Sequence, residues 1–197
     1  DYYDFFEQPD GTIYLVTGDA TGHGMTAGMM VSITKAGLHG ISQPDTKDIM
    51  SQLNTVIKNI DLGQNRMALN IGYLSNGSVQ FSSAGMPPLY FYSAAKGELN
   101  EILQVGLPLG SLKEEDYKSD TYDFNSGDIM IFLSDGLPEA TNVSGEMLGY
   151  GAVYDCILEN IDQDPKTLLN TLSRLGSEWI EGSTLDDDIT LLVVKKK

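Results

Sequence analysis

Short runs of apolar, aromatic and β-branched residues recur along the chain and are separated by turn residues, a pattern typical of β-strands. The pattern predicts strands over residues 2–7, 12–18, 67–74, 79–83, 89–92, 99–103, 121–124, 128–133 and 189–194. Pro-Asp-Gly, Ser-Asn-Gly and Lys-Gly turns stand between neighbouring runs. Such turns favour hairpins, so we expect antiparallel rather than parallel sheet.

Longer segments carry apolar residues at the three-to-four-residue spacing of an amphipathic helix. They cover residues 25–38, 45–60, 151–159 and 165–180. Asp45 is the predicted N-cap of the second helix, and Pro165 stands in the first turn of the last. Because no repeat, low-complexity run or linker divides the chain, we predict one α+β domain over residues 1–197.

The net charge argues against a nucleic-acid partner. The chain has 28 acidic residues against 12 Lys and Arg, a formal net charge of −16, whereas nucleic acids and anionic membranes select basic surfaces. The acidic excess fits cation binding or simply an acidic, soluble surface. The single cysteine, Cys156, excludes a disulfide framework within the chain and a cysteine-rich zinc site.

The chain opens directly on a strand pattern, Asp-Tyr-Tyr-Asp-Phe-Phe, without an initiator Met. We therefore expect a fragment of a longer protein. No run of 18 apolar residues and no signal peptide are found, which predicts a cytoplasmic location for this part. The rest of the protein is free to carry a membrane anchor.

Three carboxylate motifs share one setting, the point where an apolar strand meets a turn. They are residues 16–19 (Val-Thr-Gly-Asp), 132–136 (Phe-Leu-Ser-Asp-Gly) and 186–190 (Asp-Asp-Asp-Ile-Thr). The first hairpin also brings Asp1 or Asp4 toward the first motif. One such motif is most often a local turn former, but three of them at strand ends favour a shared site.

Carboxylates gathered in this way repel one another. At about 5 Å and an effective dielectric of roughly 20, each pair costs about 3 kcal/mol, so the cluster must be protonated, separated or neutralised by cations. Oxygen ligands without Cys and with little His select Mg²⁺, Mn²⁺ or Ca²⁺ over zinc. Two such ions would activate a water and hold a phosphoryl group.

These residues resemble a known family, the metal-dependent serine/threonine protein phosphatases of type 2C, in their bacterial SpoIIE-like branch, whose members regulate sigma factors. Residues 1–5 (Asp-Tyr-Tyr-Asp-Phe) look like the opening motif of that branch, and residues 18–24 (Gly-Asp-Ala-Thr-Gly-His-Gly) resemble its Gly-Asp-x-Ser/Thr-Gly-His-Gly. Residues 84–88, 107–110, 134–140 and 187–190 fit its later motifs in the same order. Met86 departs from the branch, which usually has His there, and we expect no loss of catalysis from this change.

The resemblance implies a sandwich of two antiparallel sheets flanked by helices, in α/β/β/α layers, with two or more Mn²⁺ or Mg²⁺ ions at one end. Asp19 would bridge the metals, and Ala20 would ligate through its backbone carbonyl. Asp135 and Asp187 would hold one metal, and Asp1 would act on metal-bound water or a further metal.

Asp4, His23 and Asp188 are expected around this ligand set rather than in it. Asp188 stands where the family has Asp or Asn, and the run of three aspartates that starts at Asp186 leaves the register open by one residue. His23 would either donate to the leaving group or order its loop, and its two glycine neighbours favour loop ordering.

The activity that the resemblance implies is that of a phosphoprotein phosphatase, a hydrolase for phosphoserine and phosphothreonine. A metal-activated water would attack phosphorus directly, without a phosphoenzyme. The implied substrate is a phosphorylated anti-sigma-factor antagonist, and an upstream sensor or regulatory domain would govern the activity. Association into a homodimer is left open.

The main alternative is a non-catalytic phosphatase-like module that binds a phosphoprotein or a partner kinase. Such a module would be expected to lose one of Asp19, Asp135 or Asp187, and all three are present. Residues 186–190 also fit the Asp-x-Asp-x-Thr pattern of haloacid-dehalogenase-type phosphotransferases. That motif follows a strand, whereas the predicted strand here comes after it, so we reject this reading.

Overall fold

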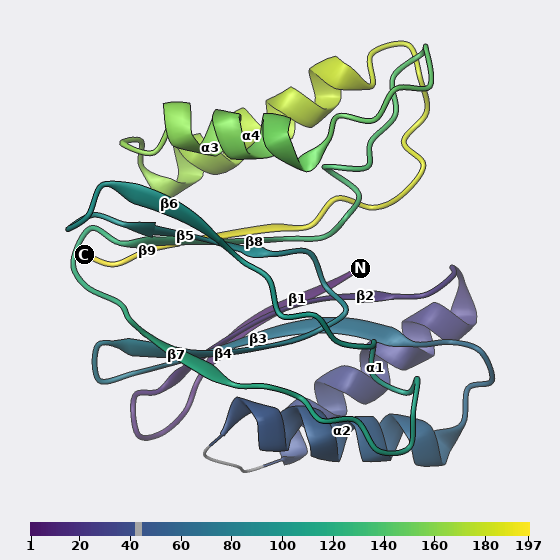
Figure 1. Ribbon diagram of the computed structural model, residues 1–197. Helices are drawn as coiled ribbons and strands as arrows, with labels where there is room; N and C mark the ends of the chain where they lie inside the picture. Colours follow the sequence, from purple (N-terminus) through teal and green to yellow (C-terminus); the bar gives the residue numbers. More distant parts are fainter. Residues whose placement is uncertain (42–44) are drawn as a thin grey trace. The chain divides into compact units, whose positions relative to one another are not determined.

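The computed structural model describes residues 1–41 and 45–197, which form nine strands and four helices (Figure 1). These residues divide into two compact units, and each contains one antiparallel sheet with two helices. The predicted α+β class, with two antiparallel sheets flanked by helices, is confirmed. The single domain over residues 1–197 stays a prediction.

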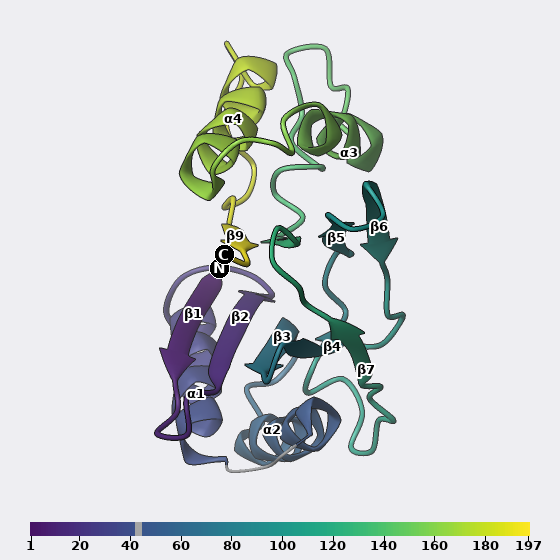
Figure 2. The same cartoon turned by 90° about the vertical axis from the view of Figure 1, so that its left-hand side faces the viewer.

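The first unit comprises residues 1–86 and 103–124. Its sheet has the strand order β1-β2-β3-β4-β7. The strands are β1 (Tyr2–Glu7), β2 (Ile13–Ala20), β3 (Met67–Ser75), β4 (Ser78–Ala84) and β7 (Asp120–Asp123). The helices α1 (Met25–Gly40) and α2 (Thr46–Ile60) lie along one face of this sheet, and their buried side chains form one core with it (Figure 2).

Local sequence explains where α2 begins and which face it buries. The carboxylate of Asp45 accepts a hydrogen bond from the Lys47 N–H at 3.0 Å, so the predicted N-cap is confirmed. Apolar residues at helical spacing, Ile49, Leu53 and Ile57, are buried against the sheet. The amphipathic stripe that the sequence predicted is thus the contact between helix and sheet.

The first hairpin follows from its turn chemistry. The Asp10 carboxylate accepts a hydrogen bond from the Thr12 N–H at 3.0 Å, and Gly11 has a φ of +84°, which favours glycine. The strands on either side, β1 and β2, pair antiparallel with Tyr2 opposite Gly18. This register brings the first residues of the chain beside the end of β2, as the sequence predicted.

The second unit comprises residues 87–102 and 125–197. Its sheet has the order β6-β5-β8-β9. The strands are β5 (Leu89–Ser93), β6 (Glu98–Ile102), β8 (Ile129–Leu133) and β9 (Leu191–Lys195), and the helices are α3 (Tyr150–Glu159) and α4 (Pro165–Trp179). Leu168 and Leu172 of α4 are fully buried in one core with Ile131 and Leu133 of β8. Among the residues that the structure describes, every helix is too short or too polar to span a bilayer.

The turn at residues 125–127 joins two strands that belong to different sheets. β7 pairs with β4, whereas β8 pairs with β5 and β9. The carboxylate of Asp128 accepts hydrogen bonds from the Asn125 N–H at 2.7 Å and the Ala94 N–H at 2.8 Å, and these bonds hold the turn. Turn residues therefore predict where the chain reverses, but not which partner each strand takes.

Gly18 lies where β2 approaches β3 too closely for a side chain. A Cβ there would come within 2.8 Å of the Ala68 backbone oxygen and 2.6 Å of the Met67 Cε. We expect Gly18→Ala to lower the free energy of unfolding by about 1–3 kcal/mol, because the strands must separate to admit the methyl group.

Gly28 is the matched control for this prediction. It stands in α1, and nothing lies within 4 Å of an added Cβ. We expect Gly28→Ala to raise the free energy of unfolding by about 0.5–1 kcal/mol, as alanine favours the helix. Urea denaturation measures both variants, and a Gly18→Ala protein as stable as the unsubstituted one would contradict the packing argument.

Candidate functional site

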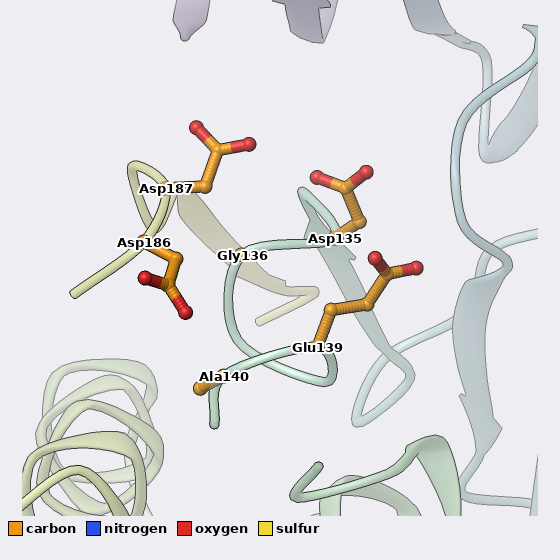
Figure 3. Close-up of a pocket in the computed structure, with 6 residues that line it drawn as sticks. All are labelled: Asp135, Gly136, Glu139, Ala140, Asp186 and Asp187. Carbon is orange, nitrogen blue, oxygen red and sulfur yellow. The ribbon is translucent and has the colours of Figure 1, made fainter. Parts of the chain in front are cut away.

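An acidic pocket opens in the second unit where β8 ends. It has a volume of about 220 Å³. Figure 3 shows its lining, which consists of Asp135, Gly136, Glu139, Ala140, Asp186 and Asp187. Two of the three predicted carboxylate motifs therefore meet in one place, although they lie about fifty residues apart in the sequence.

Pairing of β8 with β9 brings these motifs together. Leu133 lies opposite Leu191, so the residues after β8 face the residues before β9. Ser134 continues the ladder: its N–H donates to the Thr190 carbonyl at 3.0 Å, and its Oγ accepts from the Thr190 N–H at 2.9 Å. Ser134 of the Ser-Asp-Gly motif thus holds residues 186–190 beside residues 132–136.

Gly136 allows the two segments to come into direct contact. A Cβ at this position would lie 2.0 Å from the backbone oxygen of Asp188, a separation that no side chain can occupy. The glycine is therefore required by the close approach of two backbones, not by an unusual φ.

The geometry resolves which aspartate of the triple faces the pocket beside Asp135. Carboxylate oxygens of Asp135 and Asp187 lie within 4.8 Å of each other, and in Figure 3 both carboxylates extend to the same side. Asp186 also lines the pocket, but its carboxylate accepts a hydrogen bond from the Thr141 hydroxyl at 2.7 Å. Asp188 does not line the pocket, and its N–H donates to the Asp187 carboxylate at 2.8 Å.

Glu139 belongs to the pocket, yet the sequence analysis did not include it among the site residues. Its N–H donates to the Asp135 carbonyl at 2.9 Å, one helical turn along the chain, and its side chain lines the same pocket. Burial raises the pKa of the Glu139 carboxyl, and the charges of Asp135 and Asp187 raise it further. The spacing of four residues from Asp135 was the available signal.

The negative charge of the pocket also affects the pKa of Tyr150, the first residue of α3. Burial, followed by the charges of Glu139 and Asp135, raises the pKa of the Tyr150 hydroxyl to about 12. Carboxylate oxygens held at this spacing, with no sulfur and no histidine among the pocket residues, form the donor set of a hard divalent cation. The residues therefore fit the ions that the resemblance implies.

In the first unit, Asp19 stands near the end of β2 and is half-buried. It lies opposite Ala68 of β3, and Ala20 lies opposite Met67. Tyr2 and Gly18 form the last pair of the β1–β2 register, and Asp1 and Asp19 are the next residues beyond that pair. The sequence-predicted residues Asp1, Asp19 and Ala20 thus share one end of this sheet.

Asp4 lies elsewhere. Its carboxylate is 2.9 Å from the Lys35 Nζ and 3.6 Å from the His39 Nε2, both on α1, and accepts a hydrogen bond from the Tyr2 hydroxyl at 3.0 Å. Burial would raise the pKa of the Asp4 carboxyl, but the Lys35 and Tyr2 bonds outweigh it and lower the pKa. Asp4 therefore faces the helices, on the opposite side of the sheet from Asp19.

The loop after Asp19 is held by the residues that lead into β3. The Asn65 amide donates to the Thr21 carbonyl at 2.6 Å, and the Arg66 N–H donates to the Thr21 hydroxyl at 2.8 Å. Farther along, Gly22 and Gly24 have φ values of +81° and +79°, which L side chains rarely adopt. His23, between them, is exposed.

A family model described as Stage II sporulation protein E (SpoIIE) matches residues 9–197. The chain belongs to the SpoIIE family. Among curated relatives, the phosphoserine phosphatase RsbU of Bacillus subtilis (strain 168) is 24% identical, with 100% of this chain and 59% of RsbU covered. Protein IcfG of Synechocystis sp. is 23% identical, with 98% of this chain and 35% of IcfG covered. The SpoIIE-family chain thus spans less than two thirds of these relatives.

Solved structures give the same fold. The SiaA-PP2C domain of Pseudomonas aeruginosa matches with a TM-score of 0.87 at 18% identity, covering 100% of this chain and 80% of that one. The PP2C phosphatase domain of SpoIIE from Bacillus subtilis matches with a TM-score of 0.78 at 18% identity, covering 98% and 57%. The chain therefore has the fold of these PP2C domains, and the predicted resemblance to the SpoIIE branch is confirmed.

The close contact between Gly136 and the Asp188 backbone leads to a specific prediction. We expect Gly136→Ala to push the 187–188 segment away from Asp135, because a methyl group cannot fit against the Asp188 oxygen. The rise in melting temperature on adding Mn²⁺, which reports binding to the folded state, should then shrink or vanish. Gly151→Ala in α3, where an added Cβ meets nothing within 4 Å, should keep the full rise. Equal shifts in the two variants would contradict the argument.

The hydrogen bond from the Asn65 amide to the Thr21 carbonyl leads to a second prediction. We expect Asn65→Ala to speed amide hydrogen exchange of residues 21–24, since a bond of about 1 kcal/mol corresponds to roughly fivefold in an opening equilibrium. Asn100→Ala changes an exposed asparagine of β6 and is the control. Unchanged exchange of the loop in Asn65→Ala would show that the backbone alone holds it.

Proposed function

We propose that this domain is a metal-dependent protein phosphatase that hydrolyses phosphoserine and phosphothreonine. The observation that carries the proposal is the pocket of a SpoIIE-family chain in which Asp135 and Asp187 present oxygens within 4.8 Å of each other. Two such carboxylates, with Glu139 beside them, leave the site strongly negative unless cations balance it.

The proposed ions are two or more Mn²⁺ or Mg²⁺. When bound, they supply a water of lowered pKa and positive charge for the transferred phosphoryl group. Asp135 and Asp187 are the proposed ligands of one ion, Asp19 the proposed bridge and Ala20 a ligand through its carbonyl. Asp1 is proposed to orient a water or to ligate a further ion.

Other residues near these ligands have supporting tasks in this proposal. Thr141 keeps Asp186 turned aside through its hydroxyl, which leaves Asp187 as the carboxylate beside Asp135. The Asp188 N–H, which donates to Asp187 at 2.8 Å, orients that carboxylate. His23 would order its loop. Asp4, which bonds Lys35 and Tyr2, supports the β1–α1 packing instead.

The natural substrate that we propose is a phosphorylated anti-sigma-factor antagonist. The support is the relationship to RsbU, which is named a phosphoserine phosphatase, and to SpoIIE, whose solved structure contains a fragment of a regulatory domain. By the same reasoning we propose that a regulatory domain of the full-length protein governs the activity, and that the domain acts in the cytoplasm.

Metal removal tests the proposal. We expect the chain to hydrolyse a phosphoserine peptide with Mn²⁺ and to lose that activity in EDTA. Asp187→Asn and Asp19→Asn should each lower the rate by roughly a hundredfold or more, since each removes charge that holds the ions. Asp155→Asn, an exposed carboxylate of α3 outside the pocket, is the matched control and should keep the full rate.

Equal hydrolysis with Mn²⁺, with EDTA and in both aspartate variants would overturn the metal-phosphatase proposal. Binding of Mn²⁺ without hydrolysis of any phosphopeptide would favour the non-catalytic module instead.

A further inference from the structure

Exposed apolar side chains border the acidic pocket of the second unit. Val143 is 70% exposed, Met147 52% and Leu185 47%, and together these side chains form the apolar rim. They belong to two loops, residues 141–147 ahead of α3 and residues 180–187 ahead of β9. Single exposed apolar residues are common, but several of them beside a pocket are typical of a binding surface.

The two loops that carry the rim are joined next to the pocket (Figure 1). The Thr141 hydroxyl donates to the carboxylate of Asp186, a pocket residue, at 2.7 Å. A Cβ at Gly182 would lie 3.3 Å from the Val143 Cγ1, so the two loops also touch farther from the pocket. Leu185 directly precedes Asp186 in the sequence. The apolar rim therefore continues the lining of the pocket.

Hydrogen bonds fix the loop that carries Val143. The side-chain oxygen of Asn142 accepts from the N–H groups of Ser144 at 2.9 Å and Glu146 at 3.0 Å. The Trp179 indole N–H donates to the Glu146 carbonyl at 3.2 Å and ties the loop to α4. An apolar side chain presented by an ordered loop loses little backbone freedom when a partner covers it, which favours binding.

The charge around the rim restricts the chemistry of its partner. Residues 139–149 and 181–190 contain no Lys or Arg, and all their charged residues are acidic. Acidic groups of a partner would therefore be repelled here and would find no cation to pair with. Apolar groups of a partner would instead be removed from water against the rim.

We propose that the apolar rim binds the phosphoprotein substrate through apolar residues that flank its phosphoserine, and that acidic flanking residues are disfavoured. A phosphoserine side chain is short, so when its phosphoryl group lies between Asp135 and Asp187 its neighbours in the peptide lie over the border of the pocket. The rim forms part of that border. This inference rests on the proposed function, in which the pocket receives the phosphoryl group.

Hydrolysis of matched peptides in Mn²⁺ tests the inference. The probes are three phosphoserine peptides of equal length, with leucine and valine, with serine and glycine, or with glutamate around the phosphoserine, and para-nitrophenyl phosphate, which has no flanking residues. We expect kcat/KM to be highest for the apolar peptide and lowest for the glutamate peptide, with about a fivefold difference or more between each.

Substitutions at Val143 separate binding at the rim from damage to the pocket. The readout is the kcat/KM of the apolar peptide divided by that of para-nitrophenyl phosphate, because a damaged pocket lowers both values and leaves their ratio. We expect Val143→Ser to lower this ratio about fivefold, mainly through KM, since less apolar surface is buried. Val143→Ile should keep the ratio. Leu158→Ser is the matched control, an exposed leucine of α3 outside the pocket lining, and should also keep it.

Equal hydrolysis of the three peptides by the unsubstituted chain would overturn the inference, and so would an unchanged ratio in Val143→Ser. Concentration-dependent association of the chain that Val143→Ser abolishes, with the ratio unchanged, would assign the rim to a contact between two copies instead. Failure of the unsubstituted chain to hydrolyse any of the four probes would overturn the proposed function, and the inference with it.

Discussion

The candidate site depends on the antiparallel pairing of β8 with β9. Both strands continue past their regular ends through the two bonds between Ser134 and Thr190, and this extension sets Asp135 beside the aspartates before β9. Because Gly136 has no side chain, the Asp188 backbone can come into direct contact with it. Hydrogen bonds of the sheet thus hold like charges together that would otherwise separate.

Holding these carboxylates together has an electrostatic cost. Asp135 and Asp187 have oxygens within 4.8 Å, and burial, followed by the charges of these two residues, raises the pKa of the nearby Glu139 carboxyl. Charges of one sign at such distances repel by a few kcal/mol, about 3 kcal/mol at 5 Å and a dielectric of 20. Divalent cations remove this repulsion, which is why the arrangement favours a metal site over a set of separate turn aspartates.

The acidic residues near the start of the first unit lie in different surroundings. Asp1 and Asp4 are only three residues apart, yet Asp1 precedes β1 and Asp4 lies within it. Asp1 stands just before the last pair of the register, Tyr2 with Gly18, whereas Asp4 bonds Lys35 and Tyr2 on the side of the helices. Asp1 and Asp4 therefore have different roles, although they carry the same charge and are close in the sequence.

The sequence by itself determined most of the local structure. Every predicted strand and helix is present with ends that differ by only a few residues, because turns such as residues 8–11, caps such as Asp45 and apolar periodicity act within one element. Its ordered motifs also predicted the SpoIIE-like family, which the comparisons confirm.

Tertiary structure decided what depends on residues distant in the chain. The partners of β7 and β8 lie in different sheets, although a single turn joins them. The Asp187 carboxylate lies beside that of Asp135, whereas the Asp186 carboxylate bonds the Thr141 hydroxyl and Asp188 does not line the pocket. The structure placed Glu139 in the pocket with Asp135 and Asp187. Short-range sequence patterns do not predict strand partners or buried faces, because these are set by the packing of the whole chain.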